Sequence, residues 1–325
     1  MGGFKKVLTI LFVFALLLSL VVMVSAKEIT VGLVVQNASA LSQVRTMDAF
    51  KKLAEPKGWQ VLTGDGKGSP EKVASFIETF VERKVDAIVV AMAELPALEG
   101  AIKMANEAGI PIYAIDSGLV PGVACNITSN NFIIGAEMGA FLADKLGYKG
   151  NIVAIGMKEH HGTRQRRETL NAVLEEYPNI KLLADYNVRY TNFYEDAQKA
   201  MEDFVTRFGD QINAVWCAWD DLAVAATKVL QNFGYSREKI FVVGADGHPH
   251  AYAEIRNPDS PLIATVAQEF EWFAAKAVEI IEQIHVLGKS PEEVLITKNV
   301  YVPVTLVTPA NVPEEDKQPY RMPWE

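Results

Sequence analysis

The stretch IPIYAIDSG, residues 110–118, is a run of apolar side chains that ends in an acid, Asp116. Its apolar residues are too dense for a half-exposed strand, so they predict a strand of a parallel sheet that is covered on both faces. A second run, IFVVGADG at residues 240–247, repeats the pattern and ends with Asp246. Ligands of open parallel α/β sheets bind outside the carboxyl ends of the strands. The two acids therefore predict two sheets that face one ligand.

Strand-like and helix-like segments alternate along the whole chain. From residue 29 to residue 116 the alternation predicts strands at 29–35, 60–62, 86–91 and 110–116, with helices between them. The same rhythm restarts after Asn130-Asn131 and runs to the strand that ends at Asp246. We therefore expect an α/β protein with two similar doubly wound parallel-sheet lobes.

Length and composition exclude several classes of protein. A chain of 325 residues exceeds the size at which a single core stops growing, and its net charge of −9 argues against a nucleic-acid partner. The two cysteines, Cys125 and Cys217, lie in apolar surroundings and are expected to be buried thiols. The histidines at 160–161 and at 248 and 250 are interpreted as loop residues, so we expect no metal and no cofactor.

The first 26 residues have the pattern of an export signal. Lys5-Lys6 precede an apolar stretch from Val7 to Val24, and small residues precede a cleavage site after Ala26. An uncleaved membrane anchor is the alternative, because the stretch is long enough to span a bilayer. We expect the cleaved form, which makes the mature protein secreted or periplasmic.

Three motifs in a fixed order carry a resemblance to a known family. They are AIKMANEAGIP at 101–111, which runs into Ile115-Asp116, then VVGADG at 242–247 and IATVAQ at 263–268. The chain resembles the type I periplasmic sugar-binding proteins of the ribose/galactose-binding kind, which serve ABC importers.

The resemblance implies two lobes joined by a three-crossing hinge, with crossings near residues 129–130, 268–269 and 302–303. It assigns residues 27–129 and 269–302 to an N-terminal lobe, and residues 130–268 and 303–312 to a C-terminal lobe. Residues 313–325, rich in proline and charge, are expected to form an irregular tail on the surface.

The same resemblance implies which residues contact the ligand. Asp116 and Asp246 are expected to accept hydrogen bonds from sugar hydroxyls, and Gln268 is expected to bind the ligand at a hinge. Arg166 is expected to be the ligand arginine, although Arg164 and Arg167 are close enough to make the register uncertain. Ser117 stands where ribose-type binders have an arginine, so we expect a sugar that is held differently from ribose.

The aromatic residues that stack on the sugar are expected to lie in an unusual place. The family often has paired aromatic residues in the segment that here reads QNASALSQ, residues 36–43, and this segment contains none. Stacking is therefore assigned to Trp219 and Phe193. The remaining candidates for contact with the ligand are Gln36, Gln43, Asn192 and Asp220; Asp220 has the alternative role of a helix-terminal anion.

We predict a non-enzymatic, monomeric binder that captures a monosaccharide or related polyol and delivers it to an ABC permease. One alternative is the same fold with a non-sugar or signal ligand, in the service of a sensor. Another is an enzyme that uses Asp116 and Asp246 as paired carboxylates on a sugar. A transcription regulator of this fold is rejected, since it would have a DNA-reading segment where this chain has an export signal.

Overall fold

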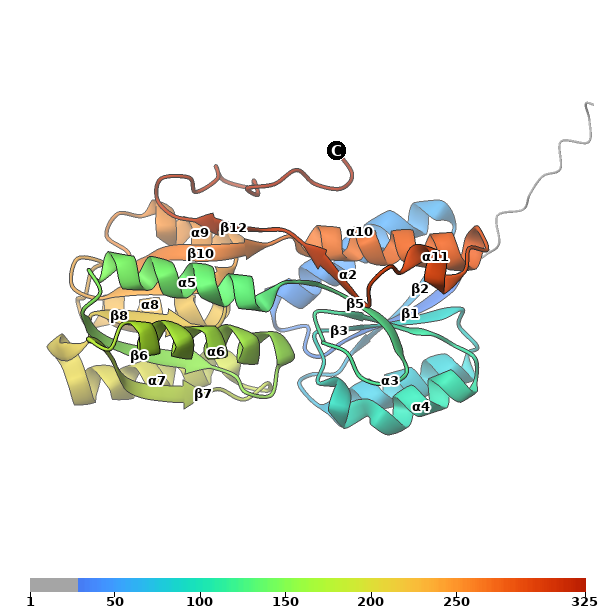
Figure 1. Ribbon diagram of the computed structural model, residues 1–325, viewed down its shortest axis with the longest axis horizontal. Coiled ribbons are helices and arrows are strands. Elements are labelled where there is room, and N and C mark those ends of the chain that lie inside the picture. The colour runs from blue at the N-terminus through green and yellow to red at the C-terminus, as the bar shows by residue number, and fades with distance from the viewer. Residues whose placement is uncertain (1–28) are drawn as a thin grey trace, which may run out of the picture.

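Two six-stranded sheets form the centres of two lobes in the computed structural model, which describes residues 29–325 (Figure 1). The predicted export signal lies outside the described residues. The first sheet has the order β11-β5-β4-β3-β1-β2, and all its pairings are parallel. Its strands are β1 (Thr30–Val35), β2 (Gln60–Asp65), β3 (Ala87–Ala91), β4 (Ile112–Ile115), β5 (Val123–Ser129) and β11 (Asn299–Val302).

The second sheet repeats this arrangement with the order β12-β10-β9-β8-β6-β7. Its pairings are parallel except that of β12, which runs antiparallel to β10. The expectation of two similar doubly wound lobes is confirmed, with β12 as the exception to parallel pairing. The strands are β6 (Gly150–Gly156), β7 (Ile180–Asn187), β8 (Ala214–Cys217), β9 (Phe241–Asp246), β10 (Leu262–Gln268) and β12 (Val304–Val307).

Helices cover both faces of the first sheet. On one face, α2 (Leu41–Ala54) and α10 (Phe270–Ile281) pack against each other. On the other face, α3 (Pro70–Glu82) and α4 (Glu99–Glu107) bury a separate set of apolar side chains. The approach of α3 is close: a Cβ on Gly32 of β1 would lie 2.4 Å from the ring of Phe80. Short helical segments complete the lobe: η1 (Glu55–Lys57), η2 (Leu95–Leu98), η4 (Glu282–Val286) and α11 (Pro291–Val294).

The second lobe has the same layered construction. Helices α5 and α6 pack together, α7 packs on α8, and α8 contacts α9. Figure 1 shows α5 and α6 in front of the second sheet. The elements are α5 (Asn131–Lys145), α6 (His161–Glu176), α7 (Phe193–Phe208), η3 (Gly209–Gln211), α8 (Asp220–Asn232) and α9 (Pro249–Arg256).

The chain passes between the two sheets three times. Strand β5 ends at Ser129, and Asn130 then caps α5 by accepting from the backbone N–H groups of Phe132 and Ile133. The second passage leads from β10 into α10, and the third leads from β11 through Pro303 into β12. Three adjacent connections of this kind form a hinge at one edge of both sheets. No helix among residues 29–325 is long and apolar enough to cross a membrane.

Candidate functional site

A pocket lies between the lobes, where the carboxyl ends of the strands in both sheets meet. This is the position at which open parallel sheets bind ligands. The centres of water molecules can occupy a volume of about 60 Å³ in this pocket, so the pocket has room for several waters. Its lining comes from both lobes: Asn37, Ala40, Ser42, Gln43, Met92, Asp116, Met157, His160, Thr163, Arg166, Tyr190, Phe193, Trp219, Asp246, Gln268 and Phe270.

The backbone is strained where three strands reach this pocket. Met92 after β3, Asp116 after β4 and Asp246 at the end of β9 have φ angles of 53°, 45° and 118°. Residues other than glycine seldom adopt positive φ, and such strain costs on the order of 1–3 kcal/mol per residue. Backbone hydrogen bonds stabilise two of these strained turns: Met92 N–H donates to Ile115 O, and Asp116 N–H donates to Ile127 O. Each strained residue also lines the pocket.

Asp116 is a buried carboxylate that accepts hydrogen bonds from two side chains. Thr128 Oγ1 donates to its Oδ1 at 2.6 Å, and Asn131 Nδ2 donates to the same oxygen at 3.1 Å. Burial alone would raise the pKa of Asp116, but the Arg166 guanidinium and these two donors together hold it below the ordinary value. Asp116 is therefore ionised at neutral pH and can accept hydrogen bonds from a ligand.

His160 joins the two lobes at the same point. Its Nε2 lies 2.9 Å from Asp116 O, and because a carbonyl only accepts, Nε2 carries the proton. Its Nδ1 then accepts from Thr163 N–H at 3.4 Å, at the start of α6. Burial lowers the pKa of His160, which agrees with this neutral form.

Arg166 is the arginine of its group that reaches the pocket. It lies on α6, is 2% exposed, and donates to Asn131 Oδ1 and Ala218 O, each at 2.7 Å. Its Nη1 is also 3.4 Å from Asp246 Oδ1. Its two neighbours are engaged elsewhere, Arg164 with Glu94 and Arg167 with Asp185.

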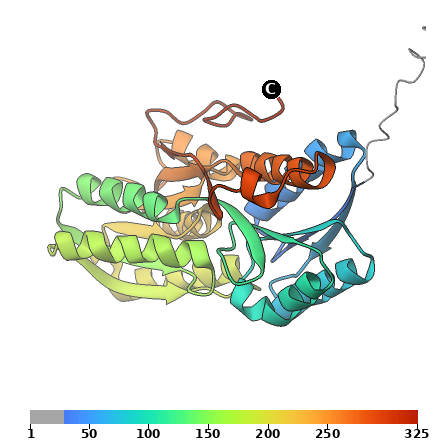
Figure 2. The same ribbon diagram turned by 45° about the vertical axis from the view of Figure 1, so that its right-hand side comes forward.

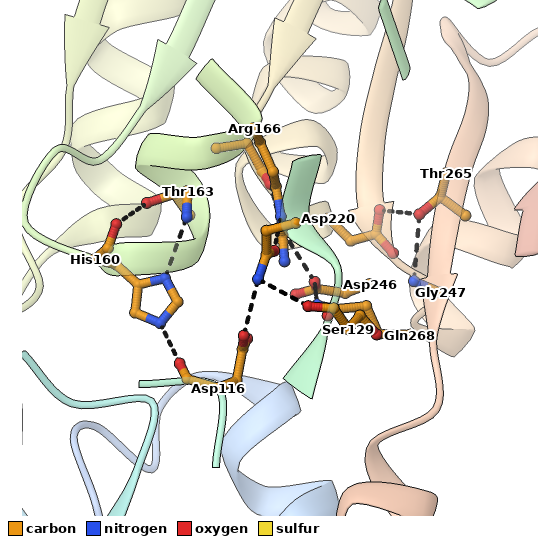
Figure 3. Close-up of polar contacts among 12 residues, drawn as sticks. Asp116, Ser129, His160, Thr163, Arg166, Asp220, Asp246, Gly247, Thr265 and Gln268 are labelled. Atoms are coloured by element: carbon orange, nitrogen blue, oxygen red, sulfur yellow. Dashed lines mark hydrogen bonds and ion pairs between the residues drawn. The ribbon is translucent and has the colours of Figure 1, made fainter. Parts of the chain in front are cut away.

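Asp246 and Gln268 face Arg166 from the ends of β9 and β10 (Figure 3). Gln268 Nε2 donates to Asp246 Oδ1 at 2.8 Å. Burial raises the pKa of Asp246 to about 8, against the opposing influence of Arg166. One guanidinium thus lies near two carboxyl groups, of which Asp116 is ionised and Asp246 is protonated at pH 7. The polar part of the pocket has no net charge in this state.

Aromatic side chains supply the apolar part of the pocket. Trp219 and Phe193 meet edge to face, with ring centroids 5.8 Å apart. Both belong to the second lobe, as predicted, and Phe270 at the start of α10 adds a third ring. Tyr190 also lines the pocket, and its buried hydroxyl has no hydrogen-bond partner among the described residues. Of the two candidate glutamines, Gln36 and Gln43, only Gln43 lines the pocket.

Four candidate residues do not line the pocket. Asp220 is fully buried beneath it, where Oδ1 accepts from Thr265 Oγ1 and Oδ2 accepts from His248 N–H, so its observed contacts fit the structural alternative. The hydroxyl of Ser117 binds the backbone of β3 and β4. Gln36 is buried but is not a lining residue, and Asn192, the residue before α7, is not one either.

Sequence reasoning missed several of the lining residues. His160 was interpreted as a loop residue, although a histidine just before a helix is a possible cap, and its side chain accepts from Thr163 N–H. Asn131 does not line the pocket but links Asp116 to Arg166. Met92 and Tyr190 follow strands without any polar motif that would distinguish them. Among residues 29–325, no group of histidine, cysteine and acidic side chains is arranged to hold a metal ion.

The two lobes contact each other around the pocket. Asn37 Nδ2 of the first lobe donates to Tyr190 O of the second at 2.7 Å, and Arg164 Nη1 is 3.2 Å from Glu94 Oε2. A third contact joins Arg45 Nη1 to Gly247 O at 3.1 Å. Together with the contact between His160 and Asp116, these bonds show that the lobes are closed over the pocket.

Comparison with known proteins places this geometry in a family. A family model described as a periplasmic binding protein domain matches residues 31–290. The chain is 28% identical to the ribose import binding protein of Bacillus subtilis over 286 residues, which cover 87% of this chain and 88% of that protein. It is 30% identical to the xylitol-binding protein of Mycolicibacterium smegmatis over 188 residues, which cover 57% of this chain and 53% of that protein.

Solved structures agree with this result. An ABC transporter solute binding protein from Agrobacterium vitis with bound allitol superposes with a TM-score of 0.81 at 25% identity, covering 88% of this chain and 97% of that one. An ABC sugar transporter subunit from Rhodobacter sphaeroides gives a TM-score of 0.79 at 26% identity, covering 87% and 98%. The match over most of the chain, together with two hinged lobes closed on a pocket, shows that this protein belongs to the periplasmic binding protein domain family.

Proposed function

We propose that this protein captures a monosaccharide or related polyol between its lobes and delivers it to an ABC importer. The observation that carries the proposal is the pocket itself, in which Asp116 from one lobe faces Arg166, Asp246 and Gln268 from the other. The family consists of binding proteins, and relatives of this chain are named for ribose, xylitol and apiose.

The polar groups suit a neutral ligand that carries many hydroxyls. Asp116 accepts, Arg166 donates, and Gln268 Oε1 is buried without a partner in the structure, so it is available to accept from a hydroxyl. The hydroxyl of Tyr190 adds a group that can donate or accept. Hydrogen bonds to charged groups contribute about 1.5–3 kcal/mol each. Because Arg166 balances only one ionised acid, a phosphorylated or acidic sugar would bring an uncompensated charge into this pocket.

The apolar groups suit the C–H face of a sugar ring or polyol chain. Trp219 and Phe193 offer aromatic surface from the second lobe, and Met92 contributes a thioether from the first. We assign stacking to Trp219 because its ring lines the pocket and is packed edge to face against Phe193. The small enclosed volume favours a single sugar unit over a chain of several.

The remaining assignments concern the whole molecule. We assign residues 27–129 and 269–302 to one lobe and residues 130–268 and 303–312 to the other, and the sheet membership of β11 and β12 supports this division. We expect a cleaved export signal, a monomer in solution and an ABC permease as the partner. The lobes would open at the three crossings to admit the ligand and close over it.

A ligand screen by thermal shift tests the proposal. The panel contains D-ribose, xylitol, allitol, myo-inositol and D-apiose. A ligand at 100 times its dissociation constant stabilises the folded state by about 2.7 kcal/mol, which raises the melting temperature by several degrees. The Asp116→Asn variant should lose that response, whereas Asp203→Asn on the exposed surface of α7 should retain it. No response to any compound in the panel would count against a sugar ligand, and mass spectrometry should recover a bound compound unchanged.

A further inference from the structure

The C-terminal tail spans the two lobes. Residues 313–325, which we call the strap, contain no helix or strand and run from the second lobe across to the first (Figures 1 and 2). Two hydrogen bonds hold the strap on α9 of the second lobe. Arg256 Nη1 donates to Pro313 O at 2.8 Å, and Tyr252 OH donates to Gln318 Oε1 at 3.0 Å.

The other half of the strap is held on the first lobe. Tyr320 OH donates to Glu271 Oε2 of α10 and accepts from Arg45 Nη2 of α2, both at 2.6 Å. Trp272 Nε1 donates to Arg321 O at 2.8 Å. At the end of the strap, Lys52 Nζ lies 3.6 Å from the centre of the Trp324 ring. Three hydrogen bonds and one cation–π contact thus hold this half of the strap on the first lobe.

Arg45 links the strap to the ligand pocket. Its guanidinium pairs with Glu271 through two hydrogen bonds of 2.9 and 3.0 Å, and the two side chains are 10% and 8% exposed. Across the boundary between the lobes, Nη1 donates to Gly247 O and to His248 Nδ1, each at 3.1 Å. Gly247 and His248 directly follow the pocket residue Asp246.

The pocket side of this linkage is tightly packed. The ring of His248 stacks on Phe270, which lines the pocket, with centroids 5.7 Å apart. The guanidinium of Arg45 also lies 4.9 Å from the centre of the Phe270 ring. Contacts therefore run without a gap from Tyr320 in the strap, through Arg45, to the turn that presents Asp246.

These contacts can all form only when the lobes are closed. Glu271 and Tyr320 orient Arg45 on the first lobe, while Gly247 O and His248 Nδ1 lie on the second. If the lobes separate, Arg45 must leave either its carboxylate or its partners across the boundary. Hydrogen bonds to charged groups contribute about 1.5–3 kcal/mol each, so this loss opposes opening. The strap adds a further restraint because it is fixed to both lobes.

We propose that the strap is a latch that favours the closed arrangement, and that Arg45 is the positioning residue through which it acts on the turn bearing Asp246. This inference rests on the proposed function in one respect, which is that closure of the lobes encloses a ligand. It assigns a role to the C-terminal residues that the binding pocket does not use.

Distances between the lobes in the protein without ligand test the latch. Spin labels are attached at Lys103→Cys on α4 and Lys199→Cys on α7, two exposed positions in different lobes. The native thiols of Cys125 and Cys217 are buried and do not compete for the label. Pulsed dipolar spectroscopy then gives the distribution of interlobe distances.

Three changes are compared in this labelled background. Deletion of residues 313–325 and the Tyr320→Phe substitution should each increase the population at longer distances at least twofold. Lys317→Ala is the matched control, because Lys317 lies in the strap and, among residues 29–325, forms an ion pair only with Glu314 beside it; it should leave the distribution unchanged. Circular dichroism shows whether each variant is folded, and Tyr320→Phe retains the ring in case the deletion unfolds the protein.

The same distribution in the unaltered protein, the deletion and Tyr320→Phe would overturn the proposal. A shift produced equally by Lys317→Ala would also overturn it, because that change leaves every contact with the lobes in place. No sugar is present in the measurement. Failure of the latch and failure of the proposed function are therefore distinguished.

Discussion

The substitution Asp246→Asn should change how the stability of this protein depends on pH. Asp246 and Asp116 share one nearby cation, Arg166, and the three side chains are almost completely buried. A single guanidinium compensates one carboxylate, and Asp116 has further donors in Thr128 and Asn131. Asp246 is therefore the acid that retains its proton, and asparagine reproduces the shape and the neutral state of that form.

The size of the effect follows from the pKa in the two states. In the unfolded chain the carboxyl has its ordinary pKa of 3.8, whereas burial raises it to about 8 in the folded protein. Between these values the folded state binds more protons than the unfolded state, so the free energy of unfolding falls as the pH rises. One pKa unit corresponds to about 1.4 kcal/mol, so the loss across this window is on the order of 6 kcal/mol. The contribution of this group to the free energy of unfolding is fully present below about pH 4 and is lost as the pH rises through about 8.

Denaturant unfolding between pH 5 and pH 9, monitored by circular dichroism, measures this dependence. The unaltered protein should lose stability steadily across the range, and Asp246→Asn should lose distinctly less, so that the variant is the more stable protein at pH 9. In the variant, part of the fall should remain between pH 5 and pH 7, because burial raises the pKa of Asp220 to about 7. The control Asp203→Asn alters an exposed acid and should run parallel to the unaltered protein. Parallel curves for Asp246→Asn would refute the assignment of a protonated Asp246.

Three further substitutions test the pocket. Tyr190→Phe removes a buried hydroxyl that has no hydrogen-bond partner among residues 29–325. Calorimetric titration with the compound identified in the screen should therefore show about tenfold weaker binding, with a melting temperature within two degrees. Trp219→Ala should weaken the same binding by at least tenfold, and an affinity within twofold of the original would contradict stacking on this ring. Asp220→Asn should lower the free energy of unfolding by about 1–3 kcal/mol, because it disturbs bonds to Thr265 and the backbone of His248, while the affinity stays within threefold.

Strand periodicity was enough to predict the two sheets and the acids at their ends. Asp116 and Asp246 follow dense apolar runs, and a strand that is buried on both faces must place the next polar residue at the edge of its sheet. The hinge crossings came from the resemblance, since nothing in the composition of residues 128–131 distinguishes them from an ordinary connection.

The detail of the pocket depends on contacts that periodicity does not encode. Asp220 follows β8 by a short turn, much as Asp116 follows β4, yet Thr265 of β10, two strands away in the same sheet, donates to it beneath the surface. Ser117 follows Asp116, but its hydroxyl turns back to the backbone of β3. Tyr190 reaches the pocket because the closed lobes bring the segment after β7 against Asn37. Each outcome depends on a partner far away in the sequence.

The three passages between the sheets also constrain how the chain can fold during synthesis. One face of the first sheet is covered by α10, whose buried residues Phe270, Phe273 and Ala277 pack against β-strand residues made more than 140 positions earlier. The edge strand β11 is made later still and pairs with β5. A nascent chain that ends at residue 129 would therefore expose an apolar face and an unpaired strand edge. We expect fragments of the N-terminal lobe to aggregate and the lobe to form only after nearly the whole chain has been made.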